Sequence, residues 1–166
     1  MLDRPATFEP STPFTRSSSF SALDRFVAGA GGEAVWLLAR CLIGGIFVQS
    51  GLGKLMALDA FAASLAKNGV PMADVAALVG AVVEFGGGLA IVIGLQTRTA
   101  ALLMVAFTVV ATLISHRFWE LQDAARKPQA VQFAKNLAIA GAFLLLFVQG
   151  GGRLGFDGWR RRASRA

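Results

Sequence analysis

The 166-residue chain is 55% hydrophobic and only 16% charged, a balance that excludes an ordinary water-soluble domain. Its formal net charge is +6 at pH 7, but the basic residues stand at the ends of apolar runs, which argues against a nucleic-acid-binding protein. Cys41 is the single cysteine of the sequence, so an intramolecular disulfide and a paired-thiol exchange site are also excluded.

Residues 1–32 are rich in Ser, Thr, Pro and Gly and contain no apolar core of a secretory signal. They are expected to form a disordered cytoplasmic tail. Within it, apolar residues recur at helical spacing between Phe20 and Val27, which predicts a short amphipathic helix on the membrane surface.

Four apolar runs follow, at about residues 34–56, 72–95, 99–115 and 133–149. Each is close to the roughly 20 residues that cross a bilayer as a helix. The fold class is therefore predicted to be all-α, a polytopic membrane protein built as a four-transmembrane-helix bundle in one domain, residues 33–152. The short return from Gly94 to Thr97 predicts a closely packed antiparallel hairpin, and residues 153–166 are expected to be a frayed, basic cytoplasmic tail.

More basic residues flank the spans on the side of the two tails and of Arg98 than on the opposite side. The positive-inside rule then places both ends of the chain in the cytoplasm, with the helices in a bacterial inner membrane.

Ionisable residues inside the spans are the first candidates for a site, because each costs roughly 2.5–3.5 kcal/mol to insert and so calls for a partner. Arg40 and Lys54 lie in the first span, and Glu84 lies near the middle of the second. Arg40 is nearer than Lys54 to the centre of its span, so an Arg40–Glu84 ion pair is predicted.

His116 ends the third span and Asn136 opens the fourth on the same side of the membrane. His116 is read either as an interfacial residue or as a ligand or proton-relay group, and the two side chains could share a polar vestibule. Small residues on the faces of the first two spans predict close helix packing, at Gly44, Gly51, Gly80, Gly87 and Gly88. No metal site is expected, because one His, one membrane carboxylate and one buried Cys at unrelated positions do not make a ligand set.

Several motifs together resemble the DoxX family over about residues 36–152: Arg40, Gly51-Leu52-Gly53-Lys54-Leu55, Glu84-Phe85-Gly86-Gly87-Gly88-Leu89, Gly94-Leu95-Gln96-Thr97-Arg98, His116 and Asn136-Leu137. The resemblance implies a small four-helix inner-membrane protein in which Arg40, Lys54 and Glu84 form the membrane-embedded set, with His116 as a looser match. The family takes its name from a subunit associated with a thiosulfate:quinone oxidoreductase, and other members are linked with oxidative-stress and quinone-detoxification systems.

Three functions remain open from the sequence: an accessory or quinone-interacting subunit of a membrane redox or oxidative-stress system, a non-catalytic membrane scaffold, and a small proton-coupled transporter. If the protein is enzymatic, it is expected to be a quinone-linked oxidoreductase subunit, with its catalytic residues unassigned. No haem, flavin or iron–sulfur ligand pattern is found, so quinone is the one cofactor considered. The expected partners are the lipid bilayer, a redox partner protein and further copies of the chain.

Overall fold

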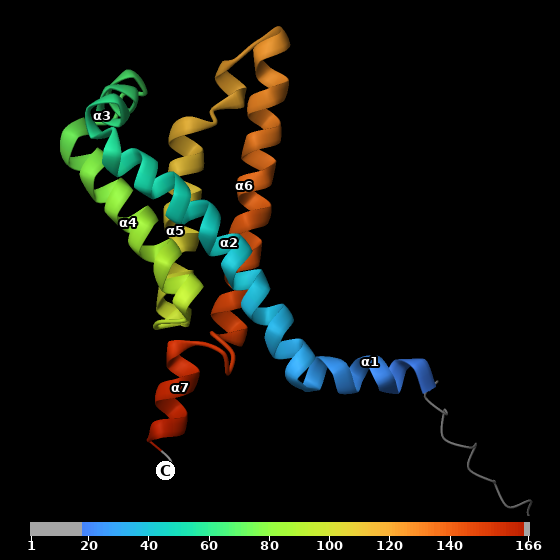
Figure 1. Ribbon diagram of the computed structural model, residues 1–166. Coiled ribbons are helices and arrows are strands. Elements are labelled where there is room, and N and C mark those ends of the chain that lie inside the picture. The colour runs from blue at the N-terminus through green and yellow to red at the C-terminus, as the bar shows by residue number, and fades with distance from the viewer. Residues whose placement is uncertain (1–17, 165–166) are drawn as a thin grey trace, which may run out of the picture.

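The computed structural model describes residues 18–164, which form helices and turns without a β-strand (Figure 1). Within this part of the chain, four helices are long and apolar enough to cross a membrane, which confirms the predicted fold class. They are α2 (Ala30–Met56), α4 (Ala73–Ile93), α5 (Thr97–Ser115) and α6 (Asp123–Gln149).

Short helices mark the two ends of the bundle. At the end that we call the tail end, α7 (Phe156–Ala163) lies beside the tight α4–α5 turn, and α1 (Ser18–Ala28) projects away from the bundle (Figure 1). At the opposite end, the loop end, lie α3 (Leu58–Lys67) and the 3₁₀ turn η1 (Phe118–Glu120). Helix α1 falls on the residues for which an amphipathic helix is expected, and the part of the predicted amino-terminal tail before Ser18 lies outside the described residues.

The packing of α2 on α4 is the most extensive in the bundle, and α5 packs in turn on α6 and α4. Glycines bring α2 and α4 together: a Cβ added at Gly44 would lie 2.7 Å from the carbonyl oxygen of Gly88, and one at Gly51 would lie 2.5 Å from the backbone nitrogen of Phe85. These distances are too short for a carbon atom, so the helices touch along their backbones. The contacts run in opposite chain directions, which makes the two helices antiparallel.

The remaining two predicted packing glycines differ from each other. Gly87 contacts the side chain of Met104 on α5, so it also sits at a close helix contact. A Cβ at Gly80 would meet the ring of Phe61 at an ordinary 3.7 Å, so helix packing at this position does not require a glycine. Gly80 faces the short helix α3, where the neighbouring backbone is further away.

A small apolar core joins the four long helices. Phe47 of α2 contacts Phe143 of α6, with ring centroids 5.3 Å apart, and Ile91 of α4 and Met104 of α5 are fully buried beside them. Most other large apolar side chains remain exposed on the outer surface of the bundle, as expected for helices that face lipid.

The described part of the carboxyl-terminal segment, residues 153–164, contains the helix α7, so the prediction that it is frayed is wrong there. Helix α5 has no side-chain cap from its own N-cap residue; instead Asp157 of α7 accepts hydrogen bonds from the backbone N–H groups of Gln96 and Thr97, both at 2.9 Å. Burial alone would raise the pKa of Asp157, but these hydrogen bonds outweigh it and hold the pKa below its ordinary value. The first turn of α5 therefore anchors α7.

The helices also extend beyond the apolar runs. Helix α6 begins at Asp123, well before the expected start of the span at residue 133, and α3 was not predicted at all. Both extra segments contain the good helix formers Ala and Lys, with Leu in α3 and Arg and Gln in the first part of α6, so helix forms where the apolar pattern stops.

Candidate functional site

A cavity of about 220 Å³ lies between the four long helices, toward the loop end. Its lining contains polar and apolar side chains in similar measure, which we call the polar wall and the apolar wall, and every spanning helix contributes to it. They are Ile46, Phe47, Ser50 and Lys54 of α2, Glu84 of α4, Phe107, Thr108, Ala111 and Ser115 of α5, His116, and Asn136 and Ile139 of α6.

The polar wall is centred on an ion pair between Lys54 and Glu84. Lys54 Nζ donates a hydrogen bond to Glu84 Oε2 at 2.5 Å, and Glu84 is only 3% exposed. The ammonium also lies 4.9 Å from the ring centroid of Phe61 on α3, a cation–π contact that holds it on the Glu84 side. Glu84 is thus paired inside the bundle, but with Lys54, and the predicted Arg40–Glu84 pair is wrong.

Arg40 lies at the tail end and does not line the cavity. Its side chain is 1% exposed, and Nη2 donates to the carbonyl oxygen of Leu154 at 2.6 Å. A Cβ on Gly94 or Gly155 would collide with its guanidinium, so these two glycines form the slot that holds it. Among the predicted embedded charges, Arg40 therefore joins the α4–α5 turn to the segment before α7, whereas Lys54 and Glu84 form the cavity.

His116 and Asn136 both line the same cavity as the ion pair. His116 Nδ1 lies 2.7 Å from Gln129 Oε1 on α6. Because that oxygen is an acceptor, it places the ring proton on Nδ1 and leaves Nε2 of a neutral imidazole free to accept a hydrogen bond. Four of the five predicted site residues are thus brought together around one space.

Hydroxyl groups complete the polar wall. Thr108 is 3% exposed, and its Oγ1 has no hydrogen-bond partner within the described part of the chain. The hydroxyl of Thr112 is not available to the cavity, because it donates to the backbone carbonyl of Thr108 at 2.6 Å. Ser50 was missed as a site residue; its signal in the sequence is its position one helical turn before Lys54, on the same face of α2.

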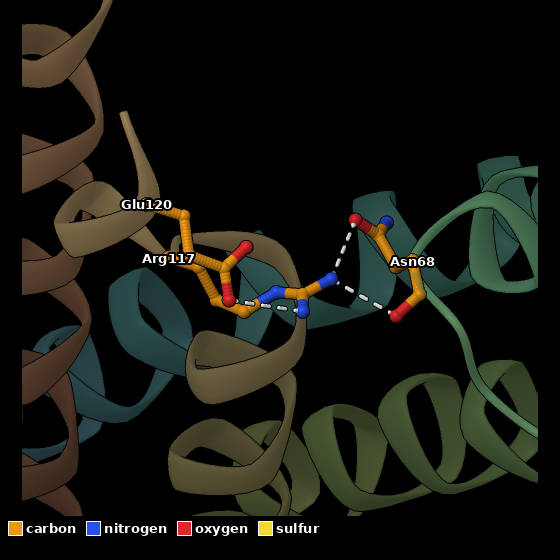
Figure 2. Close-up of polar contacts among 3 residues, drawn as sticks. All are labelled: Asn68, Arg117 and Glu120. Carbon is orange, nitrogen blue, oxygen red and sulfur yellow. Dashed lines mark hydrogen bonds and ion pairs between the residues drawn. The ribbon is translucent and has the colours of Figure 1, made fainter. Parts of the chain in front are cut away.

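A polar contact joins the two halves of the bundle at the loop end (Figure 2). Arg117 follows the cavity residue His116, and its Nη2 donates to the carbonyl oxygen of Asn68, which ends α3, at 2.9 Å. Arg117 Nη1 also pairs with Glu120 of η1 at 3.2 Å. The α5–α6 connection is thereby tied to the α3–α4 connection beside the cavity.

Comparison with known proteins places this arrangement in a family. The family model described as DoxX matches residues 35–117. The chain belongs to the DoxX family. It is 35% identical over 137 residues to inner membrane protein YphA of Escherichia coli (strain K12), an alignment that covers 82% of this chain and 98% of that protein. It is also 35% identical over 121 residues to inner membrane protein YqjF of the same organism, covering 73% of this chain and 88% of the relative.

No solved structure matches the chain. The DoxX-matching region contains Lys54, Glu84 and His116, whereas Asn136 lies beyond it, on α6. In this DoxX-family protein α6, which lies outside the matched region, contributes Asn136 and Ile139 to the cavity.

Proposed function

We propose that this DoxX-family protein is an inner-membrane protein with both ends in the cytoplasm that binds the headgroup of a membrane quinone, as an accessory subunit of a redox or oxidative-stress system. The observation that carries the proposal is the cavity in which the Lys54–Glu84 pair meets His116 and Asn136. Both relatives are named as inner membrane proteins, and the arginines concentrated at the tail end favour the stated orientation.

The chemistry of the walls fits a quinone ring. The two carbonyl oxygens of a quinone accept hydrogen bonds, and the cavity offers the Lys54 ammonium, the Asn136 amide and the hydroxyls of Ser50 and Ser115 as donors. Phe47 and Phe107 line the apolar side and can pack against a flat ring. A mixed wall of this kind binds an amphipathic ring better than a simple ion.

The tail of such a ligand also has a route to the lipid. Asn136 borders a second, shallow depression of about 40 Å³ that lies between α5 and α6 and is otherwise almost entirely apolar. Its other lining residues are Val109, Thr112, Leu113, Phe133 and Leu137. A ring in the cavity could therefore carry an isoprenoid chain that leaves the bundle past Asn136 between these two helices.

The Lys54–Glu84 ion pair would take part in the proton transfers that accompany quinone reduction. A quinone takes up electrons and protons in equal number, and the electrons here would come from a redox-active partner subunit. Glu84 could exchange a proton with a ring oxygen, while Lys54 stabilises negative charge on that oxygen. Nε2 of His116 is a further acceptor for a quinol hydroxyl.

The test is equilibrium binding of a short-chain ubiquinone analogue to the purified protein in detergent. Wild type should bind saturably, and Glu84→Gln and Asn136→Leu should each weaken binding by about tenfold or more, the usual cost of a lost charge-assisted or buried hydrogen bond. Lys135→Gln is the matched control, because Lys135 is exposed next to Asn136 and does not line the cavity. Thermal unfolding of each variant shows that the comparison is made between folded proteins.

A membrane scaffold is the second candidate, because the Lys54–Glu84 pair also joins α2 to α4, the two most extensively packed helices. On that reading wild type binds no quinone, and Glu84→Gln and Lys54→Gln lower the unfolding temperature without any other defect. Saturable quinone binding that is lost in folded variants would exclude a purely structural role.

A further inference from the structure

A second, separate hollow lies at the tail end of the bundle. It is an open groove of about 510 Å³ between α7 and the tail-end parts of α2 and α4. One wall is formed by Leu37 and Ile93 of the spanning helices, and the other by side chains of the carboxyl-terminal segment, chiefly Arg153, Phe156, Trp159 and Arg162.

The groove belongs to the folded structure, because the segment that forms its outer wall is held at three points. Trp36 Nε1 donates to the carbonyl oxygen of Gly150 at 2.9 Å, Arg40 donates to that of Leu154, and Asp157 caps α5. Two of these contacts come from α2 and the third from the amino-terminal end of α5. The two arginines are therefore presented at a defined place beside α2 and α4.

The arginines have hydrogen-bonding capacity to spare. Arg162 Nη2 donates to the carbonyl oxygen of Arg153 at 3.1 Å, which orients its guanidinium along the groove. The guanidinium of Arg153 makes no hydrogen bond or ion pair with any described residue. Glu33 accepts the backbone N–H of Arg153 at 2.6 Å, so one carboxylate lies beside this segment, and the two arginines carry the larger charge. An anion is the natural ligand for such a pair of arginines.

The apolar lining identifies what kind of anion would fit. Leu37 and Ile93 lie on helices that cross the membrane, so anything in the groove is bordered by acyl chains. Trp159 is 59% exposed and packs against Phe156 with the two rings tilted and their centroids 5.6 Å apart. Exposed aromatic side chains of this kind are typical of a membrane interface. The groove thus has arginines on one side and apolar residues of the spanning helices on the other, and a phospholipid has a charged phosphate joined to apolar acyl chains.

We propose that this groove is a binding site for an anionic phospholipid of the adjacent leaflet, with its phosphate between Arg153 and Arg162 and an acyl chain along Leu37 and Ile93. The site is independent of the quinone cavity, which lies toward the opposite end of the bundle. Its occupancy would clamp α7 against the ends of α2 and α4.

The experiment is native mass spectrometry of the full chain in neutral detergent, titrated with phosphatidylglycerol or with phosphatidylcholine. Wild type should bind one phosphatidylglycerol saturably and bind phosphatidylcholine at least about tenfold more weakly. Arg153→Gln/Arg162→Gln should remove this preference. Arg160→Gln/Arg161→Gln is the matched control, since it removes the same charge from the same carboxyl-terminal segment but outside the groove, and it should retain the preference.

Three results would overturn the proposal: equal loss in both double variants, which would indicate diffuse surface charge; no loss in either; or saturation of the site by inorganic phosphate alone. Trp159→Ala gives a second probe that leaves the charges and the buried anchors intact, and it should weaken phosphatidylglycerol binding by about threefold or more. Thermal unfolding without lipid confirms that each variant is folded before binding is compared.

Discussion

The backbone contact between α2 and α4 predicts that Gly44→Ala destabilises the bundle while Gly45→Ala, its neighbour on the same helix, does not. The added methyl at Gly44 would lie 2.7 Å from the carbonyl oxygen of Gly88 and 3.2 Å from the backbone nitrogen of Val92. At Gly45 nothing lies within 4 Å of the added carbon. The two substitutions are chemically identical and differ only in the space around them.

The expected magnitude follows from the geometry. Non-bonded carbon contacts are favourable at about 3.5–4.0 Å, so the helices must separate locally by somewhat under 1 Å to admit the Gly44 methyl. Neither backbone atom can rotate away, as a side chain could. Overpacking of this kind costs about 1–3 kcal/mol. Gly45→Ala should be neutral or stabilising by up to about 1 kcal/mol, because alanine is the better helix former.

The measurement is reversible unfolding in mixed detergent micelles, followed by circular dichroism, with both variants compared with wild type. A Gly44→Ala protein as stable as the Gly45→Ala protein would refute the close backbone contact. The same comparison can be repeated at Gly88 against Gly86, since Gly86 also has nothing within 4 Å of an added carbon whereas Gly88 faces the carbonyl oxygen of Gly44 at 2.9 Å.

Three further predictions concern the tail end. The lowered pKa of Asp157 means that its capping bonds stabilise the fold above the unfolded carboxyl pKa of about 3.9 and lose their effect as the pH falls through the lower folded value; thermal unfolding of wild type and Asp157→Asn should therefore differ at neutral pH and converge in acid. Arg40→Met should lose the bond to the Leu154 carbonyl, at a cost of about 1–3 kcal/mol, and speed tryptic cleavage in α7 without affecting quinone binding. A green fluorescent protein fused to the carboxyl terminus should fluoresce, and an alkaline phosphatase fusion at the same point should be inactive, if that end is cytoplasmic.

The number and type of the long helices could be predicted because the signal is local. An apolar run of about 20 residues has few alternatives to a membrane-crossing helix, whatever the rest of the chain does. The extent of α6 and the existence of α3 are different, because amphipathic and polar segments also form helices when they pack on a neighbour. Hydropathy along the chain does not predict which segments pack on a neighbouring helix.

The partner of Glu84 could not be read from positions along each span. The prediction of Arg40 assumed that helices of similar length are aligned by their centres, but the glycines set a different register, in which Gly51 lies against Phe85. Glu84 precedes Phe85 and Lys54 lies three residues beyond Gly51, so these two side chains meet. The Asp157 cap was missed for a similar reason, since its partner Thr97 is 60 residues away in the chain.

Arg40 and Lys54 therefore lie on one face of α2 but have different roles: Arg40 stabilises the fold, whereas Lys54 faces the cavity. Both cations lie on the glycine-lined side of α2, roughly 21 Å apart at about 1.5 Å per residue, yet one is enclosed by backbone groups at the tail end and the other is paired with a carboxylate at a cavity. Arg40 is enclosed and bound to a backbone carbonyl, with Nε and Nη1 buried and unpartnered among the described residues, and it does not reach the cavity. Lys54 faces both Glu84 and the cavity, so its ammonium can turn to a ligand. If the cavity is the functional centre, Lys54→Gln should reduce ligand binding in a folded protein and Arg40 variants should lose stability first. If instead Arg40 variants lost ligand binding while folded and Lys54→Gln did not, the ligand site would lie at the tail end.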